Sequence, residues 1–175
     1  MLRKAYFAGG CFWCIEPVFE ALPGVKSAVS GYSGGREANP SYSDVKAQRT
    51  GHRETVCVEY DDAAVSYEAL LEAYLGSVDP FDGGGQFIDR GHSYTLAVYF
   101  TCDEERIAAE RALAALEASA NQKSAISVEP FDSFYQAEED HQDYYLKNPE
   151  AFRRELEESG RTARLSVLRE SEAGE

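Results

Sequence analysis

The sequence predicts an α+β fold in which helices pack on a largely antiparallel sheet. Short apolar segments with strand character alternate with stretches whose apolar residues recur at helical spacing, in the order β-α-β-β-α-β-α-β. Two connections, 33–51 and 79–92, exceed a dozen residues and contain repeated glycines. Connections this long are uncommon in a compact domain and often form its functional site.

The composition is that of a folded, acidic domain. The chain has 175 residues, of which 43% are hydrophobic, and its formal net charge is −14. No stripe of cations offers a nucleic-acid surface, and an anionic membrane would repel this charge. No apolar run approaches the ~20 residues that span a bilayer, and residues 1–10 lack the features of a secretory signal. We therefore expect a cytoplasmic protein with no nucleic-acid or membrane partner.

The first half of the chain predicts three strands and one helix. Residues 3–8 form a strand closed by Gly9-Gly10, and residues 25–32 and 55–60 form two more. Between the first two lies a helix that Pro23-Gly24 ends, with apolar positions Ile15, Val18, Phe19 and Leu22. Proline lacks an N–H and fits the first turn of a helix, so Pro17 places the helix start near Cys14.

The second half continues the alternation of helices and strands. Ser66 caps a helix that carries Leu70, Leu71, Tyr74 and Leu75. Further on we expect a strand at 94–101, a helix at 103–120, a strand at 127–130 and short helices at 137–146 and 149–159. Residues 1–160 then make a single domain, and 161–175 a polar, loose tail. The whole predicts a two-layer α+β sandwich with a ferredoxin-like core and long loops.

The sharpest local feature is the segment Gly9-Gly10-Cys11-Phe12-Trp13-Cys14. A thiol at a helix N-terminus faces unpaired backbone N–H groups and the positive end of the helix dipole, and both favour the nucleophilic thiolate. The glycines allow a sharp turn and leave the sulfur approachable. A cysteine three residues further on can form a disulfide with little movement. The pattern predicts that Cys11 attacks and is oxidised, and that Cys14 then resolves it.

Other uses of the cysteines are weaker. Zinc needs about four ligands, whereas Cys57 and Cys102 are single residues in or beside predicted strands. We expect no metal, and we interpret these two cysteines as small buried hydrophobes. A thioredoxin-like dithiol is the stronger alternative. Such sites usually carry small residues or Pro between the cysteines, however, and Phe12 and Trp13 instead make an apolar wall.

Further motifs follow the cysteine pair along the chain. They are Gly31-Tyr32-Ser33-Gly34-Gly35, Asn39-Pro40-Ser41-Tyr42, Thr50-Gly51-His52-Arg53-Glu54, Asp89-Arg90-Gly91 and Ala137-Glu138-Glu139-Asp140-His141-Gln142-Asp143-Tyr144-Tyr145-Leu146. Together with Gly10-Cys11-Phe12-Trp13-Cys14, these separated blocks resemble, in the same order, the A-type peptide methionine sulfoxide reductases. The resemblance runs from residue 5 to about residue 150, and the combination is far more specific than any one block.

The resemblance implies a role for three residues in the reaction itself. Cys11 looks like the nucleophile that attacks the sulfoxide sulfur and becomes a sulfenic acid. Cys14 looks like the resolving cysteine of one branch of the family. Glu54 falls where the family has its acid. This fits the chemistry, because a sulfoxide oxygen leaves poorly until it is protonated, and a carboxyl group in a partly apolar pocket keeps its proton near neutral pH.

Five further residues are implied to bind the substrate. Tyr42 and Tyr94 fall where the family hydrogen-bonds the sulfoxide oxygen, and two phenols can steady charge that develops there. Phe12 and Trp13 look like the apolar pocket for the S-methyl group, and Asp89 falls at another polar position of the site.

Several positions depart from the family's pattern. The usual Gln-Tyr-Arg-Ser reads Ser93-Tyr94-Thr95-Leu96, the usual His before Asp-Pro is Val78, and the Thr after it is Phe81. Tyr94 is retained, so the departures bear on substrate preference, and we expect Phe81 and Phe87 to add apolar surface at the rim. Glu138-x-x-His141 has the spacing of di-iron ligands but lacks a second copy, so we expect it to have a buried hydrogen-bonding role.

These observations predict an oxidoreductase that repairs proteins after oxidative stress. It reduces methionine S-sulfoxide, free or in proteins, through a Cys11 sulfenic acid and a Cys11–Cys14 disulfide. The resemblance implies the S preference and a thioredoxin-like dithiol as reductant. We expect a monomer without a cofactor. Two alternatives stay open: a general dithiol oxidoreductase for protein disulfides, and a non-catalytic protein that binds oxidised peptides through Trp13 and neighbouring aromatics.

Overall fold

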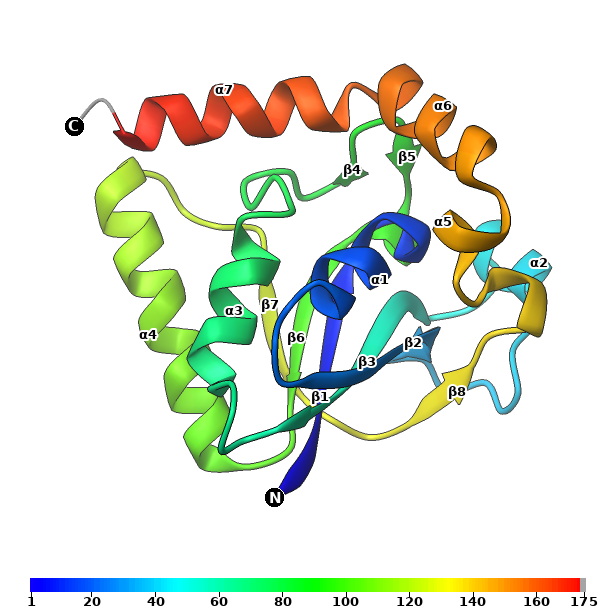
Figure 1. Ribbon diagram of the computed structural model, residues 1–175, viewed down its shortest axis with the longest axis horizontal. Helices are drawn as coiled ribbons and strands as arrows, with labels where there is room; N and C mark the ends of the chain where they lie inside the picture. The colour runs from blue at the N-terminus through cyan, green and yellow to red at the C-terminus, as the bar shows by residue number, and fades with distance from the viewer. Residues whose placement is uncertain (174–175) are drawn as a thin grey trace.

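A six-stranded mixed sheet organises the fold (Figure 1). The structure is a computed structural model that describes residues 1–173. The sheet has the order β7-β6-β1-β3-β2-β8. Its strands are β1 (Leu2–Gly9), β2 (Val25–Ser33), β3 (Arg53–Asp61), β6 (Leu96–Phe100), β7 (Ser127–Pro130) and β8 (Phe134–Gln136). A separate two-stranded hairpin joins β4 (Gly85–Gln86) to β5 (Asp89–Arg90).

The four central strands, in the order β6-β1-β3-β2, pair antiparallel throughout. With a helix after β1 and another after β3, this is the order that the expected ferredoxin-like core requires. The α+β class is confirmed, but the sheet is wider than expected. Strand β7 pairs parallel with β6, and β8, which the sequence pattern did not predict, pairs antiparallel with β2.

The described residues also form seven α-helices and two 3-10 helices. They are α1 (Phe12–Glu20), α2 (Tyr42–Lys46), α3 (Tyr67–Leu75), α4 (Asp103–Ala120), α5 (Tyr144–Lys147), α6 (Pro149–Ser159), α7 (Arg161–Ala173), η1 (His92–Tyr94) and η2 (Glu139–His141). Ser66 accepts a hydrogen bond from Ala69 N at the start of α3, which confirms the predicted cap. None of the helices in the described part of the chain is long and apolar enough to cross a membrane.

Alternation along the central strands divides the apolar side chains between two faces. Phe7 of β1 is fully buried on one face, where it packs against Phe19 of α1 and Tyr74 of α3 with ring centroids 5.0 and 5.2 Å apart. Its neighbour Tyr6 points to the opposite face and stacks at 4.0 Å on Phe131, which lies in the segment between β7 and β8. Helices therefore cover one face of the sheet, and an irregular segment covers part of the other.

Two sequence expectations about the elements are wrong. Helix α1 begins at Phe12 instead of near Cys14, so Pro17 lies inside the helix, beyond its first turn. The missing N–H of proline at this position costs one helical hydrogen bond, which packing of the buried face of α1 must offset. The connection 33–51 is not purely a loop, because it contains α2, where Ser41 caps Asp44 N.

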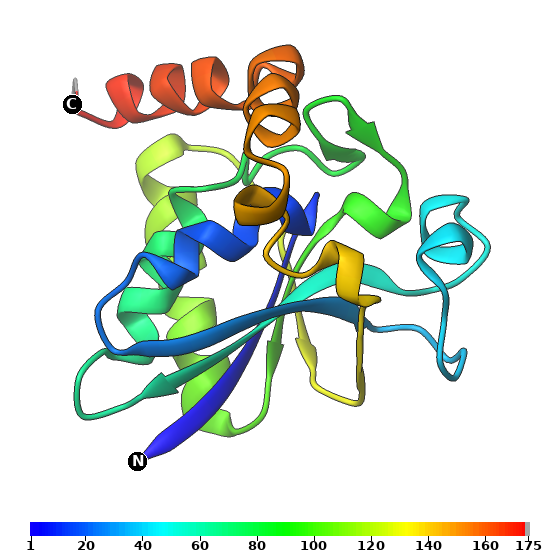
Figure 2. The ribbon, with the colours of Figure 1, turned by 45° about the vertical axis from the view of Figure 1, so that its right-hand side comes forward.

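The C-terminal residues are the largest departure. Residues 161–173, expected as a loose polar tail, form helix α7. Arg161, its first residue, is only 4% exposed. It donates hydrogen bonds to Ser77 O at 2.8 Å and Gly9 O at 3.3 Å. Figures 1 and 2 show α6 and α7 on the side of the molecule where α1 begins. The polar sequence gave no apolar period from which this buried arginine could be predicted.

The contact between Phe7 and the helices predicts a large loss of stability in Phe7→Ala. Truncation leaves a cavity beneath α1 and α3, and we expect the free energy of unfolding to fall by about 3–5 kcal/mol in denaturant titration. The exposed Leu146→Ala, 64% accessible, should change it by less than about 0.5 kcal/mol. A similar loss in both variants would contradict this account of the core.

Candidate active site

Cys11 lies at the junction of β1 and α1, where it is the N-cap residue of the helix. The turn depends on Gly10, whose φ of +83° lies in the left-handed region. A Cβ at Gly10 would also come within 2.7 Å of the Cβ of Gln86, which is fully buried and bonded to the backbone of Asp79. Glycine is therefore required here for both conformation and space, and this fixes where the thiol of Cys11 points.

The first free N–H of α1 is used by a carboxyl group instead of the thiol. Phe12 N donates to Glu54 Oε1 at 3.1 Å, and no capping hydrogen bond from the helix reaches the Cys11 side chain. The expected stabilisation of a Cys11 thiolate by these N–H groups is therefore not seen. The pairing of β1 with β3 brings Glu54, at the start of β3, beneath the helix terminus.

Glu54 is 2% exposed, and this burial is the main reason that its pKa is raised to about 8. The hydrogen bond from Phe12 N and one from the Tyr94 side chain oppose the shift, while the charge of Asp89 adds to it. The carboxyl group is therefore mostly protonated at neutral pH. An acid that keeps its proton near pH 7 and yields it readily is suited to general acid catalysis.

A cavity of about 100 Å³ opens above Cys11. Six of the eight predicted site residues line it, namely Cys11, Trp13, Cys14, Tyr42, Asp89 and Tyr94. The side chain of Glu54 is buried beside the cavity and does not line it. Phe12 is 1% exposed and does not line this cavity, so its expected contact with the substrate stays a prediction.

The indole of Trp13 is held within an aromatic stack. It lies 4.0 Å from the ring of Tyr144 at 10° and 6.1 Å from that of Tyr42 at 27°. Its Nε1 donates to His141 Nδ1 at 3.2 Å, and His141 is 7% exposed. The expected hydrogen-bonding role of His141 is confirmed, since it fixes the plane of Trp13. Glu138 is exposed, but it accepts hydrogen bonds from Tyr32 OH and Tyr42 N.

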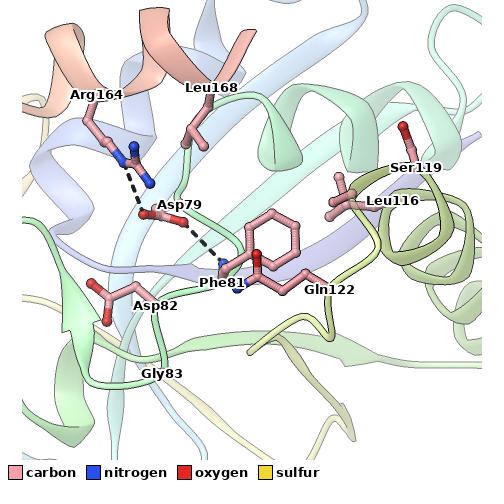
Figure 3. A pocket seen from close by; sticks show the side chains of 10 residues that line it. Asp79, Phe81, Asp82, Gly83, Leu116, Ser119, Gln122, Arg164 and Leu168 are labelled. Atoms are coloured by element: carbon pink, nitrogen blue, oxygen red, sulfur yellow. Dashed lines mark hydrogen bonds and ion pairs between the residues drawn. The ribbon is translucent and has the colours of Figure 1, made fainter. Parts of the chain in front are cut away.

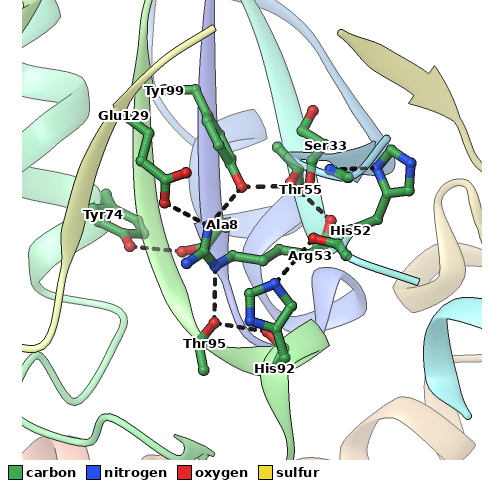
Figure 4. A network of polar contacts seen from close by, with 12 residues as sticks. Ala8, Ser33, His52, Arg53, Thr55, Tyr74, His92, Thr95, Tyr99 and Glu129 are labelled. Atoms are coloured by element: carbon green, nitrogen blue, oxygen red, sulfur yellow. Dashed lines mark hydrogen bonds and ion pairs between the residues drawn. The ribbon is translucent and has the colours of Figure 1, made fainter. Parts of the chain in front are cut away.

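A polar network around Arg53 and Thr95 holds the backbone next to two site residues. Glu54 directly follows Arg53 in the chain, and Tyr94 directly precedes Thr95. Arg53 donates to Thr95 Oγ1 at 2.8 Å, Tyr99 OH at 3.0 Å and Glu129 Oε2 at 2.7 Å (Figure 4). Thr95 is one of the positions that depart from the family's pattern, and here its hydroxyl is part of the bond that ties β3 to the loop of Tyr94.

The two thiols of the site are coupled. A hydrogen bond to Cys14 and burial raise the pKa of Cys11, and the charges of Glu54 and Asp89 act in the same direction. The pKa of Cys14 is lowered, because it shares that hydrogen bond and lies near Arg161. Both sulfurs are free thiols in this structure. The pair therefore shares one proton readily, and its first ionisation belongs to the pair as a whole.

Sequence reasoning missed one side of the cavity. Lys46 and Ile88 line it, and so do three residues from the C-terminal helices: Glu155, Ser159 and Arg161. No spacing or motif indicated them, because they approach only after α6 and α7 fold back over the site. Of the two expected rim phenylalanines, Phe87 lines the cavity and stacks beneath Arg161 at 4.6 Å, whereas Phe81 does not line it.

Phe81 lines a different and larger cavity, of about 580 Å³, between the 79–83 loop, α4 and α7 (Figure 3). There Arg164 Nε lies 3.5 Å from Asp79 Oδ2, whose carboxylate also accepts from Phe81 N. None of the predicted site residues lines this cavity.

One group of three carboxylates offers metal-ligand geometry within the described residues: Glu16, Glu20 and Asp143, with ligand atoms within 4.8 Å of one another. Glu16 already accepts hydrogen bonds from Ser30 Oγ at 2.6 Å and Asp143 N at 2.9 Å. Those bonds tie α1 to β2 and to the start of α5, so the cluster has a structural explanation.

Comparison with known proteins places this chain in a family. Residues 3–171 match the family model described as peptide methionine sulfoxide reductase. Peptide methionine sulfoxide reductase MsrA of Halalkalibacterium halodurans is 46% identical over 162 residues, which cover 91% of this chain and 92% of that protein.

Solved structures of the same family have the same fold. Methionine sulfoxide reductase A of Corynebacterium diphtheriae superposes with a TM-score of 0.77 at 30% identity, covering 85% of this chain and 76% of that one. Reduced Mxr1 of Saccharomyces cerevisiae gives 0.81 at 25% identity, covering 85% and 87%, and Mxr1 has also been solved in complex with Trx2. The chain therefore belongs to the peptide methionine sulfoxide reductase family, as an oxidoreductase of the MsrA type.

Proposed function

We propose that this enzyme reduces methionine S-sulfoxide, in proteins or free, with Cys11 as nucleophile and Cys14 as resolving cysteine. The observation that supports this most strongly is the burial of the Glu54 carboxyl group, which raises its pKa to about 8, beside a cavity lined by Cys11, Cys14, Tyr42 and Tyr94. Nucleophile, acid and oxygen-binding hydroxyls thus surround one small volume. The S preference follows from the family and stays a prediction.

The first step exchanges an oxygen atom between two sulfurs. The sulfur of Cys11 attacks the sulfoxide sulfur, the oxygen is protonated from Glu54, and the products are methionine and a Cys11 sulfenic acid. The hydroxyls of Tyr42 and Tyr94 donate hydrogen bonds to the oxygen as its charge develops. Burial raises the pKa of both tyrosines, so each phenol keeps its proton for this purpose.

The next steps return Cys11 to its reduced form. The sulfur of Cys14 displaces water from the sulfenic acid, which forms the Cys11–Cys14 disulfide. A dithiol reductant then opens the disulfide and is itself oxidised. Trx2, seen with Mxr1, is the kind of partner we propose. Such a reductant fits the cytoplasmic location expected from the sequence.

The methyl group of the substrate is proposed to lie against Trp13. The indole is held in place by Tyr144 and His141, and it lines the cavity together with the apolar side chains of Phe87 and Ile88. A fixed apolar wall opposite two fixed hydroxyls distinguishes the two epimers at sulfur, because only one presents methyl and oxygen to the correct sides.

The cysteine roles predict distinct outcomes for three serine variants. Cys11→Ser should lose all reduction of a methionine sulfoxide peptide, because no thiol remains to accept the oxygen. Cys14→Ser should convert one equivalent of peptide and then stop when thioredoxin is the reductant. Cys102→Ser is the matched control and should turn over normally, since Cys102 lies at the start of α4, away from the cavity.

The measurement is product formed per enzyme, with the sulfoxide epimers separated by chiral chromatography. Sustained turnover by Cys14→Ser with thioredoxin would contradict the resolving role. Reduction of insulin disulfides without any sulfoxide consumption would favour the general dithiol oxidoreductase instead.

Glu54 predicts an alkaline limit to the first step. Its acid form dominates below the pKa of about 8, so the single-turnover rate should fall as the pH rises through that value. Glu54→Gln should slow the step by on the order of 100-fold or more, and its rate should no longer fall as the pH rises through 8. Glu105→Gln, which alters a buried carboxyl group on α4, is the control. It should keep the wild-type single-turnover rate and its fall at alkaline pH.

The same shift has a consequence for stability. Because the folded-state pKa of Glu54 is raised from 4.5 to about 8, its favourable contribution is full below 4.5 and is lost as the pH rises to 8. Glu54→Gln should therefore lose stability less steeply than the wild type over this window in denaturant titrations. Parallel pH profiles for the two proteins would contradict the raised pKa.

A further inference from the structure

Cys14 lines a second cavity, of about 310 Å³, which lies between α1, α6 and α7. We name it the rear groove. Its walls are Pro17 and Val18 of α1, Phe152 and Leu156 of α6, and Leu165 of α7. We call the cavity of about 100 Å³ above Cys11 the substrate cavity. Of its lining residues, the rear groove shares only Cys14 and Arg161. Cys11 lines the substrate cavity and not the rear groove.

Helix α6 separates the two spaces. Its residues Glu155 and Ser159, four apart, face the substrate cavity, whereas Phe152 and Leu156, also four apart, face the rear groove. Arg161 closes the partition at the end of α6, where its guanidinium is bonded to the carbonyls of Gly9 and Ser77. A molecule bound in the substrate cavity is therefore separated from one bound in the rear groove, although both cavities give access to Cys14.

The two sulfurs differ in access, because Cys14 lines both cavities and Cys11 lines only the substrate cavity. Cys11 is 8% exposed, and its cavity holds only about 100 Å³, whereas Cys14 is partly exposed. A methionine side chain can reach down such a cavity, because its sulfur lies one bond farther from the backbone than a cysteine sulfur does. A cysteine on another protein would have to bring its backbone into the cavity to reach Cys11.

Charge also favours the approach of a protein thiolate to Cys14 through the rear groove. The substrate cavity is lined by Asp89 and Glu155 as well as Lys46, and carboxylates repel an approaching thiolate. The described lining of the rear groove contains Arg161 and Arg169 and no acidic residue. In a chain with 31 Asp and Glu against 17 Lys and Arg, such a lining is complementary to a thiolate framed by apolar side chains.

We propose that the rear groove is the docking site of a dithiol protein reductant, whose thiolate attacks Cys14 Sγ. This rests on the Cys11–Cys14 disulfide of the proposed function. A sulfur–sulfur bond forms between reductant and Cys14 while the Cys11–Cys14 bond breaks and Cys11 leaves as a thiolate. The second thiol of the reductant then attacks its own mixed disulfide, releases Cys14 as a thiolate beside Arg161 and leaves the reductant oxidised.

The relative acidity of the two thiols acts against attack on Cys14 with Cys11 as the leaving group. The hydrogen bond with Cys11 and, after it, the charge of Arg161 lower the pKa of Cys14, and the more acidic thiol leaves faster, which alone would favour attack on Cys11. We expect access to outweigh this effect, because a protein thiol can approach Cys14 through the rear groove but can approach Cys11 only through the small substrate cavity. The apolar walls of the groove also match what a protein dithiol offers and a small thiol lacks, so the groove distinguishes the two kinds of reductant.

The first test maps the mixed disulfide. The oxidised wild-type enzyme is mixed with a thioredoxin whose second active-site cysteine is serine, free thiols are alkylated, and the linked peptides are identified by mass spectrometry. We expect thioredoxin on Cys14 and the alkyl group on Cys11. Thioredoxin on Cys11 would overturn the proposal. The disulfide must first be shown to form after one equivalent of sulfoxide, and its absence would instead count against the proposed function.

The second test obstructs the groove without touching the substrate cavity. Thr162 is exposed at the groove rim, in the first turn of α7, where an added carboxylate is compatible with the helix. Thr162→Glu should slow reduction of the oxidised enzyme by thioredoxin about 10-fold or more, with reduction by dithiothreitol and the single-turnover rate unchanged. Val167→Glu, on α7 outside the groove and 54% exposed, is the charge-matched control. Equal thioredoxin rates in both variants and the wild type would overturn the docking site.

Discussion

The hydrogen bond between Phe12 N and Glu54 Oε1 is the contact on which the site depends. It joins the first turn of α1 to the start of β3 and so holds the proposed nucleophile, Cys11, and the proposed acid, Glu54, at a fixed separation. The carboxyl group takes the N–H that would otherwise face the thiol, and it is buried deeply enough that its pKa rises to about 8. Burial raises the pKa of Glu54 although this hydrogen bond opposes the shift, and the hydrogen bond to Cys14 together with burial raises the pKa of Cys11.

The surroundings of this contact are polar but almost fully paired. Arg53 and Thr95 connect the two strands beside it, His141 orients Trp13, and Gln86 fills the space that Gly10 leaves. Such networks hold side chains in one geometry because each unpaired buried group would cost free energy. A reaction that needs an oxygen and a methyl group on opposite sides of one sulfur benefits from walls of this kind.

The C-terminal helices change what the site is. These helices supply one wall of the substrate cavity, through Glu155, Ser159 and Arg161. With them, Arg161 lies beside Cys14, Glu155 enters the substrate cavity, and a second, apolar groove reaches the resolving sulfur. The asymmetry between a nearly buried Cys11 and a more accessible Cys14 suits two successive reactions, one with a side chain and one with a protein.

The sequence by itself determined the family, the α+β class, most strand and helix positions and six of the residues around the substrate cavity, because these depend on local periodicity and on motifs. It placed Phe12 at the substrate and Arg161 in a loose tail, and both assignments depended on which neighbour each side chain meets. Only the tertiary structure decided that Phe12 turns into the core, that Glu54 takes the helix N–H, and that α7 brings Arg161 to Cys14. Burial and charge at a site are sums over segments distant in the chain, and a local pattern contains neither.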